Sequence, residues 1–234
     1  MANIIEFKNV VKEYVTGDKR LLAVNQANFT IAEGEFVMIL GPSGAGKSTI
    51  LNLLGGMDSA TGGEIIVNGK NIEHYNDRQL TNYRAANVGF VFQFYNLIPS
   101  LTAYENVNIT KDIVKNVIDA KEVLNMVGLK EHMDQFPMQL SGGEQQRVSI
   151  ARAVAKNPTM LLCDEPTGAL DSETGIVVLE LLQKMSKEQK KTVIIVTHNA
   201  ALAETADKVI RVRNGKIVDI TINENPQNVS EVNY

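Results

Sequence analysis

A glycine-rich turn between a short apolar strand and a helix is the feature that most constrains the fold of this chain. The apolar run 35-EFVMIL-40 leads directly into 41-GPSGAGKS-48, and 48-STILNLLGGM-57 then has the pattern of a helix. Glycines allow the backbone amides of such a turn to curl around an anion, and the helix that follows adds the positive end of its dipole. The chain therefore contains a strand–turn–helix unit that suits phosphate.

This turn, called the P-loop below, also fits the pattern G-x-x-x-x-G-K-[ST] through Gly41, Gly46, Lys47 and Ser48. The lysine of this pattern reaches the β- and γ-phosphates of a nucleotide, and the hydroxyl of the last residue can ligate Mg²⁺. We therefore expect a nucleotide and Mg²⁺ at this turn, with Lys47 acting on the phosphates and Ser48 on the metal.

The rest of the chain alternates short apolar strands with helices. Strand-like runs occur at 88-VGFVFQ-93, 159-TMLLCDEP-166 and 192-TVIIVTH-198, and a helix is expected from about Glu173 to Lys187. Continuous apolar strands that alternate with helices indicate a mostly parallel sheet that is buried on both faces. We predict one α/β core with a mostly parallel sheet and a mostly helical insert.

Two asparagine-glycine pairs predict hairpins at either end of this core. Asn68-Gly69 would turn the segment 64–72, and Asn214-Gly215 would turn the segment 208–220. We assign residues 1–220 to a single domain.

The segment from about 94 to 157 is the predicted insert, and the core is formed by about 1–93 and 158–220. Within the insert, the apolar spacing of 112-DIVKNVIDAKEVLNMV-127 predicts a helix that Gly128 would cap. The polar, Asn-rich residues 221–234 are expected to form a tail.

Composition narrows the functional classes. The formal net charge of −4 gives no basic surface for nucleic acid. The single cysteine, Cys163, lies in an apolar run, which indicates a buried thiol and a reducing compartment. The first residues lack the apolar core of a signal peptide, and no run approaches the roughly 18–20 apolar residues of a membrane span. We expect a chain that does not itself cross a membrane.

Polar residues that can bind a metal or take part in catalysis follow three further strands. Asp164 ends one strand and could hold Mg²⁺, while the adjacent Glu165 could polarise a water for attack on the γ-phosphate. His198 ends another strand, as a partner of that phosphate or water, and Gln93 could complete the metal shell where core and insert join. Because the carboxyl ends of parallel strands share one edge of a sheet, these residues point to one site.

A second phosphate-friendly stretch, 140-LSGGEQQRVSIARA-153, lies outside that set. Ser141, Gly142 and Gly143 precede an Ala-rich helix, and a helix start with free amides and little bulk suits an anion. The two remaining histidines, His74 and His132, have no such context and are expected at the surface.

In their order and spacing, these motifs resemble the ATP-binding subunits of ABC transporters from about Phe7 to Ile220. LSGGE resembles the signature motif that distinguishes this family from other P-loop proteins. The resemblance implies an α/β fold with a P-loop NTPase (RecA-like) core and a mostly parallel sheet, an N-terminal antiparallel β subdomain and an inserted α-helical subdomain. By this resemblance Tyr14 would stack on adenine, Gln93 would report nucleotide state, Asp171 would belong to the D-loop and Glu165, His198 and Lys47 would be catalytic. The residues expected to contact ATP are Tyr14, Gly41, Pro42, Ser43, Gly44, Ala45, Gly46, Lys47, Ser48, Thr49, Gln93, Ser141, Gly142, Gly143 and Asp171, and those expected to hold Mg²⁺ are Ser48, Gln93 and Asp164.

The same resemblance implies an assembly. Two copies would sandwich two ATP molecules head to tail, each between the P-loop of one copy and the signature of the other. The insert would contact a separate integral membrane permease, which places the chain on the cytoplasmic face of a membrane without crossing it.

Within the family, 89-GFVFQFYNLIPSLTAYENV-107 and 164-DEPTGALDSETG-175 look like the macrolide-exporter and lipoprotein-release branch, which favours an export or peptide-resistance system. Ala60, where a proline is usual, and a short segment between Asn106 and Gly128 depart from that branch and leave the partner open.

Two alternatives stay open. A signalling or mechanotransmission subunit, which moves no cargo, would use the same nucleotide machinery. A DNA-repair ATPase of the same family would carry long coiled-coil arms or zinc-binding cysteines between the P-loop and the signature, and the insert has neither.

Overall fold

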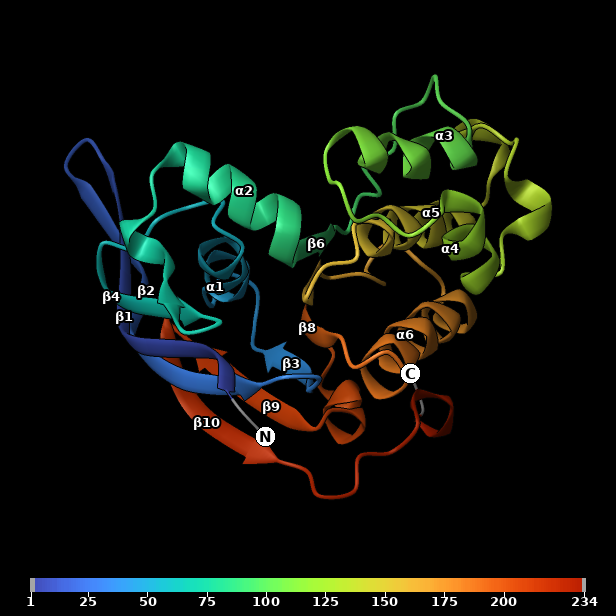
Figure 1. Cartoon of the computed structure of the whole chain (residues 1–234). Coiled ribbons are helices and arrows are strands. Elements are labelled where there is room, and N and C mark those ends of the chain that lie inside the picture. Colours follow the sequence, from blue (N-terminus) through green and yellow to red (C-terminus); the bar gives the residue numbers. More distant parts are fainter. Residues whose placement is uncertain (1–2, 233–234) are drawn as a thin grey trace.

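The computed structural model describes residues 3–232, which form two β-sheets and a helical insert (Figure 1). The larger sheet has the order β10-β9-β3-β8-β7-β6. Its strands are β3 (Phe36–Leu40), β6 (Val88–Val91), β7 (Met160–Asp164), β8 (Thr192–Thr197), β9 (Lys208–Arg213) and β10 (Lys216–Ile222). All neighbours pair in parallel except β9 and β10, so the sheet is mostly parallel as predicted.

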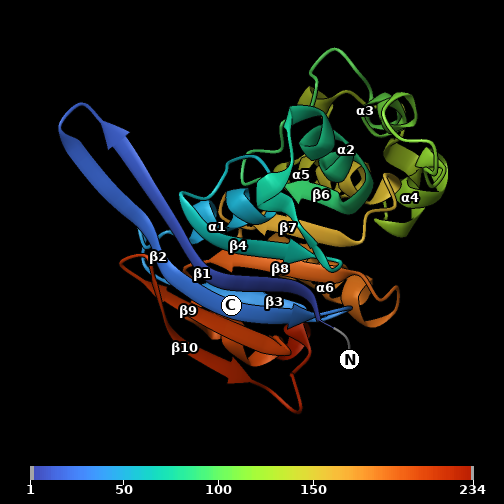
Figure 2. The ribbon, with the colours of Figure 1, turned by 60° about the vertical axis from the view of Figure 1, so that its left-hand side comes forward.

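The smaller sheet is antiparallel and has the order β2-β1-β4-β5. Its strands are β1 (Asn3–Thr16), β2 (Lys19–Ala32), β4 (Gly62–Val67) and β5 (Lys70–Asn71). Figure 2 shows the β1–β2 hairpin extending well beyond the body of the molecule. Both predicted asparagine-glycine turns are present, with positive φ at Asn68 and Gly69 and again at Asn214 and Gly215.

Six α-helices complete the described part of the chain. They are α1 (Lys47–Leu54), α2 (Asp77–Asn87), α3 (Ala103–Asn108), α4 (Ala120–Met126), α5 (Gly142–Ala155) and α6 (Ser172–Lys187). In Figure 1, α3, α4 and α5 gather in the insert, whereas α1 lies beside the smaller sheet. None of the helices formed by residues 3–232 has the length and apolar character needed to cross a membrane.

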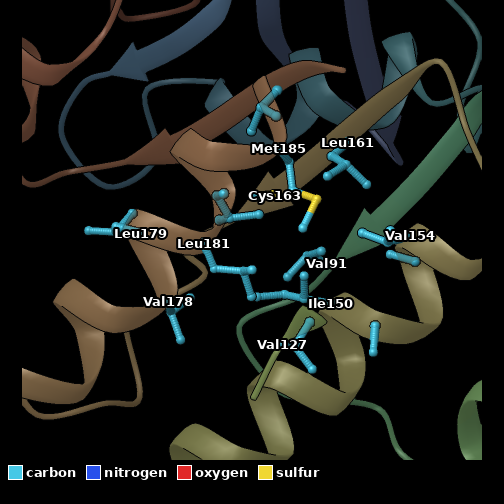
Figure 3. Packing of buried hydrophobic residues seen from close by; sticks show 14 of the residues in the cluster. Val91, Val127, Ile150, Val154, Leu161, Cys163, Val178, Leu179, Leu181 and Met185 are labelled. Atoms are coloured by element: carbon cyan, nitrogen blue, oxygen red, sulfur yellow. The ribbon is translucent and has the colours of Figure 1, made fainter. Parts of the chain in front are cut away.

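The inner strands β3, β7 and β8 of the larger sheet are buried on both faces and are apolar at nearly every position. Along β3, Phe36, Met38 and Leu40 join the core under α5 and α6, while Val37 and Ile39 join the core under α1 and the smaller sheet. Cys163 is fully buried in the first of these cores (Figure 3), and burial raises the pKa of its thiol. The prediction of a buried thiol is confirmed.

The predicted helix over 112–127 is shorter than its apolar spacing suggests. Only α4 forms, because the Asp119 carboxylate accepts hydrogen bonds from the Lys121 and Glu122 amides and fixes the helix start. Before it lies a 3-10 turn at Ile109–Asp112. The predicted cap is present: Gly128 has φ 72°, and its amide donates to the Asn125 carbonyl.

The predicted polar tail is partly wrong. β10 continues to Ile222, and Val229 is buried against the core beside α6. The Gln183 side chain of α6 donates to the Gln227 carbonyl at 3.0 Å and accepts from the Val229 amide at 3.3 Å. Burial of Val229 and the hydrogen bonds made by Gln183, Asn223 and Gln227 therefore hold this polar segment on the domain. Residues 233–234 lie outside the described residues.

Candidate functional site

Three strand ends with polar residues lie side by side at one edge of the larger sheet. β8 lies between β3 and β7, and all three are parallel. The register pairs Leu40 of β3 with Thr197 of β8, and Asp164 of β7 with Val196 of β8. The P-loop, the acidic pair and His198 therefore meet at the carboxyl edge, where open α/β sheets bind ligands.

Lys47 lies inside the P-loop. It is only 6% exposed, and its Nζ donates to the carbonyl oxygens of Gly41 at 2.9 Å and Pro42 at 3.1 Å. Gly46 is the N-cap of α1 and provides no side-chain hydrogen bond, so the first amides of that helix are left for an anion. The loop thus combines a buried lysine with helix-start amides that no side chain among residues 3–232 caps.

The shape of the P-loop depends on glycine at position 46. Gly46 has φ 103°, and a Cβ atom there would overlap the carbonyl oxygen of Ala23 in β2. From the other side, the Gly215 amide donates to the Ala45 carbonyl at 2.9 Å. The β1–β2 and β9–β10 hairpins therefore hold the loop between them.

A cavity of about 410 Å³ opens over the P-loop. Its lining residues are Tyr14, Leu21, Leu22, Ala23, Gly44, Ala45, Gly46, Lys47, Ser48, Thr49, Asn214 and Gly215. Polar groups gather at the P-loop end and apolar side chains at the hairpin end. This division suits a ligand with a phosphate tail and a flat apolar head, and the volume is within the usual range for small-molecule sites. Pro42 and Ser43 are exposed beside the cavity.

Tyr14 stands at the apolar end of this cavity in a fixed orientation. Its hydroxyl donates to Asp58 at 2.7 Å, and Lys12 contacts the same carboxylate at 2.6 Å. The Lys12 ammonium also lies 4.9 Å from the centre of the Tyr14 ring. Burial, with the Asp58 contact, raises the pKa of Tyr14. The sequence pointed to Tyr14 but not to the two side chains that orient it.

Two of the three predicted Mg²⁺ ligands, Ser48 and Asp164, are in contact with each other. The Ser48 hydroxyl donates to Asp164 Oδ1 at 3.0 Å. Burial raises the pKa of Asp164, to which neighbouring Glu165 also contributes. No group of three or more His, Cys, Asp or Glu side chains within residues 3–232 is arranged to hold a metal by itself. A hydroxyl and a carboxylate beside a phosphate cradle nevertheless fit Mg²⁺, which takes few protein ligands and completes its shell with phosphate and water.

Gln93, the third predicted ligand, follows β6, and its side chain lies close to Gly168 in the segment after Glu165. Its Nε2 lies 3.0 Å from the position that a Cβ atom on Gly168 would occupy. No hydrogen bond of Gln93 to Ser48 or Asp164 occurs within residues 3–232. The structure thus places Gln93 between the insert and the acidic strand end, and its role toward a metal stays a prediction.

Glu165 and His198 contact each other across β7 and β8. The His198 Nδ1 atom lies 3.0 Å and 3.1 Å from the two carboxylate oxygens of Glu165. The Glu165 side chain is 20% exposed and that of His198 is 70% exposed. Glu165 also has φ 47°, a left-handed conformation that is unfavourable for a residue with a side chain. Strain at a site-lining carboxylate is typical of a functional position.

The signature stretch lies apart from the P-loop. Ser141, Gly142 and Gly143 are absent from the cavity lining given above, and Figure 1 shows α1 and α5 well separated. Ser141 is the N-cap of α5 and is engaged with Glu144, because one carboxylate oxygen accepts from its amide at 2.7 Å and its hydroxyl at 2.8 Å. The P-loop and the start of α5 therefore do not line a common cavity in one chain.

The two glycines of the signature, Gly142 and Gly143, also lie close to other side chains of the same chain. A Cβ atom on Gly143 would overlap the Thr174 Cγ2 atom of α6. One on Gly142 would lie 2.8 Å from the Tyr95 hydroxyl. Sequence reasoning attributed these glycines only to the approach of a second nucleotide, and close packing is a second cause.

His132 is not the unattached surface residue that the sequence suggested, whereas His74 is exposed as expected. The His132 Nε2 atom lies 3.3 Å from the Glu144 carboxylate, and the His132 Nδ1 atom is buried with no hydrogen-bond partner among residues 3–232. Nothing in the sequence around His132 indicated this contact.

Asp171, the predicted D-loop residue, caps α6. Its two oxygens accept from the Thr174 amide and the Thr174 hydroxyl, both at 2.9 Å. These hydrogen bonds lower the pKa of Asp171. Since Thr174 also packs on Gly143, the cap joins the D-loop to the signature.

Gln146 is a site-supporting residue that sequence reasoning missed. It is 0% exposed, and its Nε2 donates to the Pro166 carbonyl at 2.7 Å and the Phe92 carbonyl at 3.2 Å. It thereby ties α5 to the segments that carry Glu165 and Gln93. A glutamine on an otherwise apolar helix face was the available signal.

Known proteins of one family are similar to this chain in sequence and structure. The ABC transporter family model matches residues 24–168, which is more than half of the chain. An uncharacterized ABC transporter ATP-binding protein of Thermotoga maritima is 43% identical over 225 residues, covering 94% of this chain and 96% of that protein. A putative ABC transporter ATP-binding protein homologue of Mycoplasma pneumoniae is 44% identical over 235 residues. The chain spans about half the length of this and a second mycoplasma relative, 50% in each case.

A solved structure has the same fold. It is the dimer of an ATP-binding cassette of Methanocaldococcus jannaschii in a post-hydrolysis state, bound to ADP and Pi. The TM-score is 0.85 at 41% identity, and the match covers 93% of this chain and 98% of that one. The chain therefore belongs to the ABC transporter ATP-binding family, as a P-loop ATPase domain that binds ATP.

Proposed function

We propose that two copies of this chain close head to tail around two ATP molecules and hydrolyse them to drive a separate membrane protein. The observation that carries this proposal is the separation of the P-loop from Ser141. Each chain has a cavity for one nucleotide and, elsewhere, a helix start that suits the γ-phosphate of another. One related cassette has been solved as a dimer in two structures, which supports the pairing.

In this proposal the cavity of one chain holds ATP with its base against Tyr14 and its phosphates on the P-loop amides and Lys47. Ser48 and Asp164 hold Mg²⁺, which would neutralise charge on the β- and γ-phosphates when bound. The Glu165 carboxylate accepts a proton from the attacking water. His198, now 3.0 Å from Glu165, orients that carboxylate and lies beside the γ-phosphate position. Gln93 reports the state of this site to the insert.

A gel-filtration experiment tests the sandwich. Glu165→Gln keeps the shape of the side chain but removes its basicity, so ATP should be bound without turnover and hold the dimer together. Glu188→Gln, an exposed change at the C-terminal end of α6, is the matched control and should stay monomeric under the same conditions. A Glu165→Gln variant that remains monomeric at saturating Mg·ATP would refute the sandwich.

The membrane partner is proposed to be a permease that docks on the insert. Large apolar side chains are exposed there and beside Gln93, including Met138 at 91%, Phe94 at 73% and Ile113 at 61%. Such side chains are typical of surfaces that bind a partner. Docking would place the chain on the cytoplasmic face of a membrane. The resemblance to exporter sequences favours an export or peptide-resistance system over a signalling complex.

Copurification from membranes tests this part. We expect an integral membrane protein to copurify with the chain and to be lost when Phe94 and Met138 are both changed to Ser. Recovery of a sensor kinase or an extracytoplasmic enzyme without a transport pathway would instead support the signalling function. Nucleic-acid stimulation of ATP hydrolysis would contradict both.

A further inference from the structure

The start of α5 holds a carboxylate on the groups that are expected to bind the partner's ATP. Glu144 Oε2 accepts from the Ser141 amide at 2.7 Å and from the Ser141 hydroxyl at 2.8 Å. In return the Glu144 amide donates to the Ser141 hydroxyl oxygen at 3.3 Å. Both donors of Ser141 are therefore engaged by an anion of the same chain.

The other oxygen of this carboxylate faces a different residue. Glu144 Oε1 lies 3.3 Å from His132 Nε2, on the 3-10 turn Lys130–His132. The two side chains are partly buried, at 21% and 34% exposure. The Ser141 amide and the charges of His132 and Arg147 all lower the pKa of Glu144, in that order of cause, so the group is held as a carboxylate.

We infer that Glu144 is an internal competitor for the γ-phosphate of the partner's ATP, and that His132 is the positioning residue that retains the carboxylate when Ser141 is released. This inference rests on the proposed head-to-tail sandwich. A γ-phosphate that binds the Ser141 amide and hydroxyl must displace Glu144 Oε2 from them. Because both groups are negatively charged and share one pair of donors, their repulsion opposes pairing of the two chains. The contact between His132 Nε2 and Glu144 Oε1 offsets that repulsion.

The chain offers a matched control for this idea. Thr102 and Glu105 at the start of α3 form the same reciprocal cap, with Glu105 Oε2 accepting from the Thr102 amide at 2.8 Å and the Thr102 hydroxyl at 3.0 Å. Changing either glutamate to glutamine removes one charge from one helix cap. Only Glu144 lies at the signature, so only its change should affect pairing.

The experiment measures the Mg·ATP concentration that gives half-maximal dimer on gel filtration, with Glu165→Gln as the parent chain. Adding Glu144→Gln should lower this concentration roughly three- to tenfold, because one screened like-charge interaction is removed. Adding Glu105→Gln should leave it unchanged. Adding His132→Leu should raise it roughly two- to threefold, and that effect should vanish when Glu144→Gln is also present.

The outcomes separate this inference from the function on which it rests. A parent chain that never pairs with ATP overturns both. A parent that pairs normally, with no change on adding Glu144→Gln, overturns only the competition. An effect of His132→Leu that persists beside Glu144→Gln shows a purely structural role for His132 and overturns its assignment as a positioning residue.

Discussion

Replacing Gly143 with alanine tests whether the signature glycine is needed for packing inside one chain. A Cβ atom at this position would overlap Thr174 Cγ2, and the rest of the Thr174 side chain lies 3.5–3.8 Å away. Overpacking of this kind costs about 1–3 kcal/mol. Alanine regains up to about 1 kcal/mol over glycine in a helix. We therefore expect Gly143→Ala to lower the free energy of unfolding by about 1–2 kcal/mol in urea titrations.

A second substitution makes this prediction specific. Thr174→Ser removes the overlapping methyl group but keeps the hydroxyl that donates to Asp171 at 2.9 Å. In the double variant the clash is gone, so its stability should exceed the sum of the two single changes by about 1–3 kcal/mol. Additive losses, or a Gly143→Ala chain as stable as the original, would show that packing on α6 does not require this glycine.

The same double variant also separates packing from nucleotide binding. In the Glu165→Gln background we expect its folding stability to return while its ATP-dependent pairing stays impaired, because the added methyl group remains at the signature. Full recovery of pairing would mean that the partner's nucleotide does not need Gly143 to lack a side chain.

Three further perturbations follow from burial and charge. Burial, with the nearby Glu165 charge, raises the pKa of Asp164 above its ordinary 3.8. The folded chain therefore binds this proton more tightly than the unfolded chain and loses stability as pH rises from 3.8 through the raised pKa. Asp164→Asn should be more stable than the original chain at pH 7 and equal to it below about pH 3.8 in urea titrations. Burial, followed by the Arg84 charge, lowers the pKa of Lys156 from 10.5 to about 8, so the original chain should gain stability relative to Lys156→Met as pH rises from 8 toward 10.5. Val229→Ala, a change at 1% exposure, should cost about 1–3 kcal/mol by the same measurement, and no loss would show that the C-terminal segment does not stabilise the domain.

The parts of the fold that were predicted correctly depend on short-range patterns. The apolar runs that became β3, β7 and β8 are apolar at nearly every position, which only a strand buried on both faces requires. The turns at Asn68-Gly69 and Asn214-Gly215 need positive φ at both residues, which the two residue types supply. These signals lie within the segment that they describe.

The errors arose where the outcome depended on a competing local interaction or a distant one. Asp119 stopped the expected helix from extending back toward residue 112, since a side-chain cap within a run ends the helix whatever the spacing of its valines. Val229 appeared to be an isolated apolar residue in a polar tail, but it is buried in the core beside α6, and its amide donates to Gln183, which is distant in sequence. The spacing of apolar residues along the chain does not predict contacts of this kind.

The candidate site shows the same division. The motifs identified the groups that would touch a nucleotide, because the chemistry needs those residue types in that order. They did not identify the residues that hold these groups, such as Gln146 beneath the strand ends and Asp58 behind Tyr14. Supporting residues of this kind are chosen by three-dimensional fit and have no fixed spacing.

The left-handed backbone of Glu165 has a consequence for how this protein can change over evolutionary time. A side chain in that conformation costs of order 1 kcal/mol or more, which glycine would not incur and asparagine would incur less. Selection for a longer-lived folded state would therefore favour loss of the glutamate. A copy of this protein under no selection for the glutamate should therefore lose it early, and its free energy of unfolding should rise as that residue is replaced.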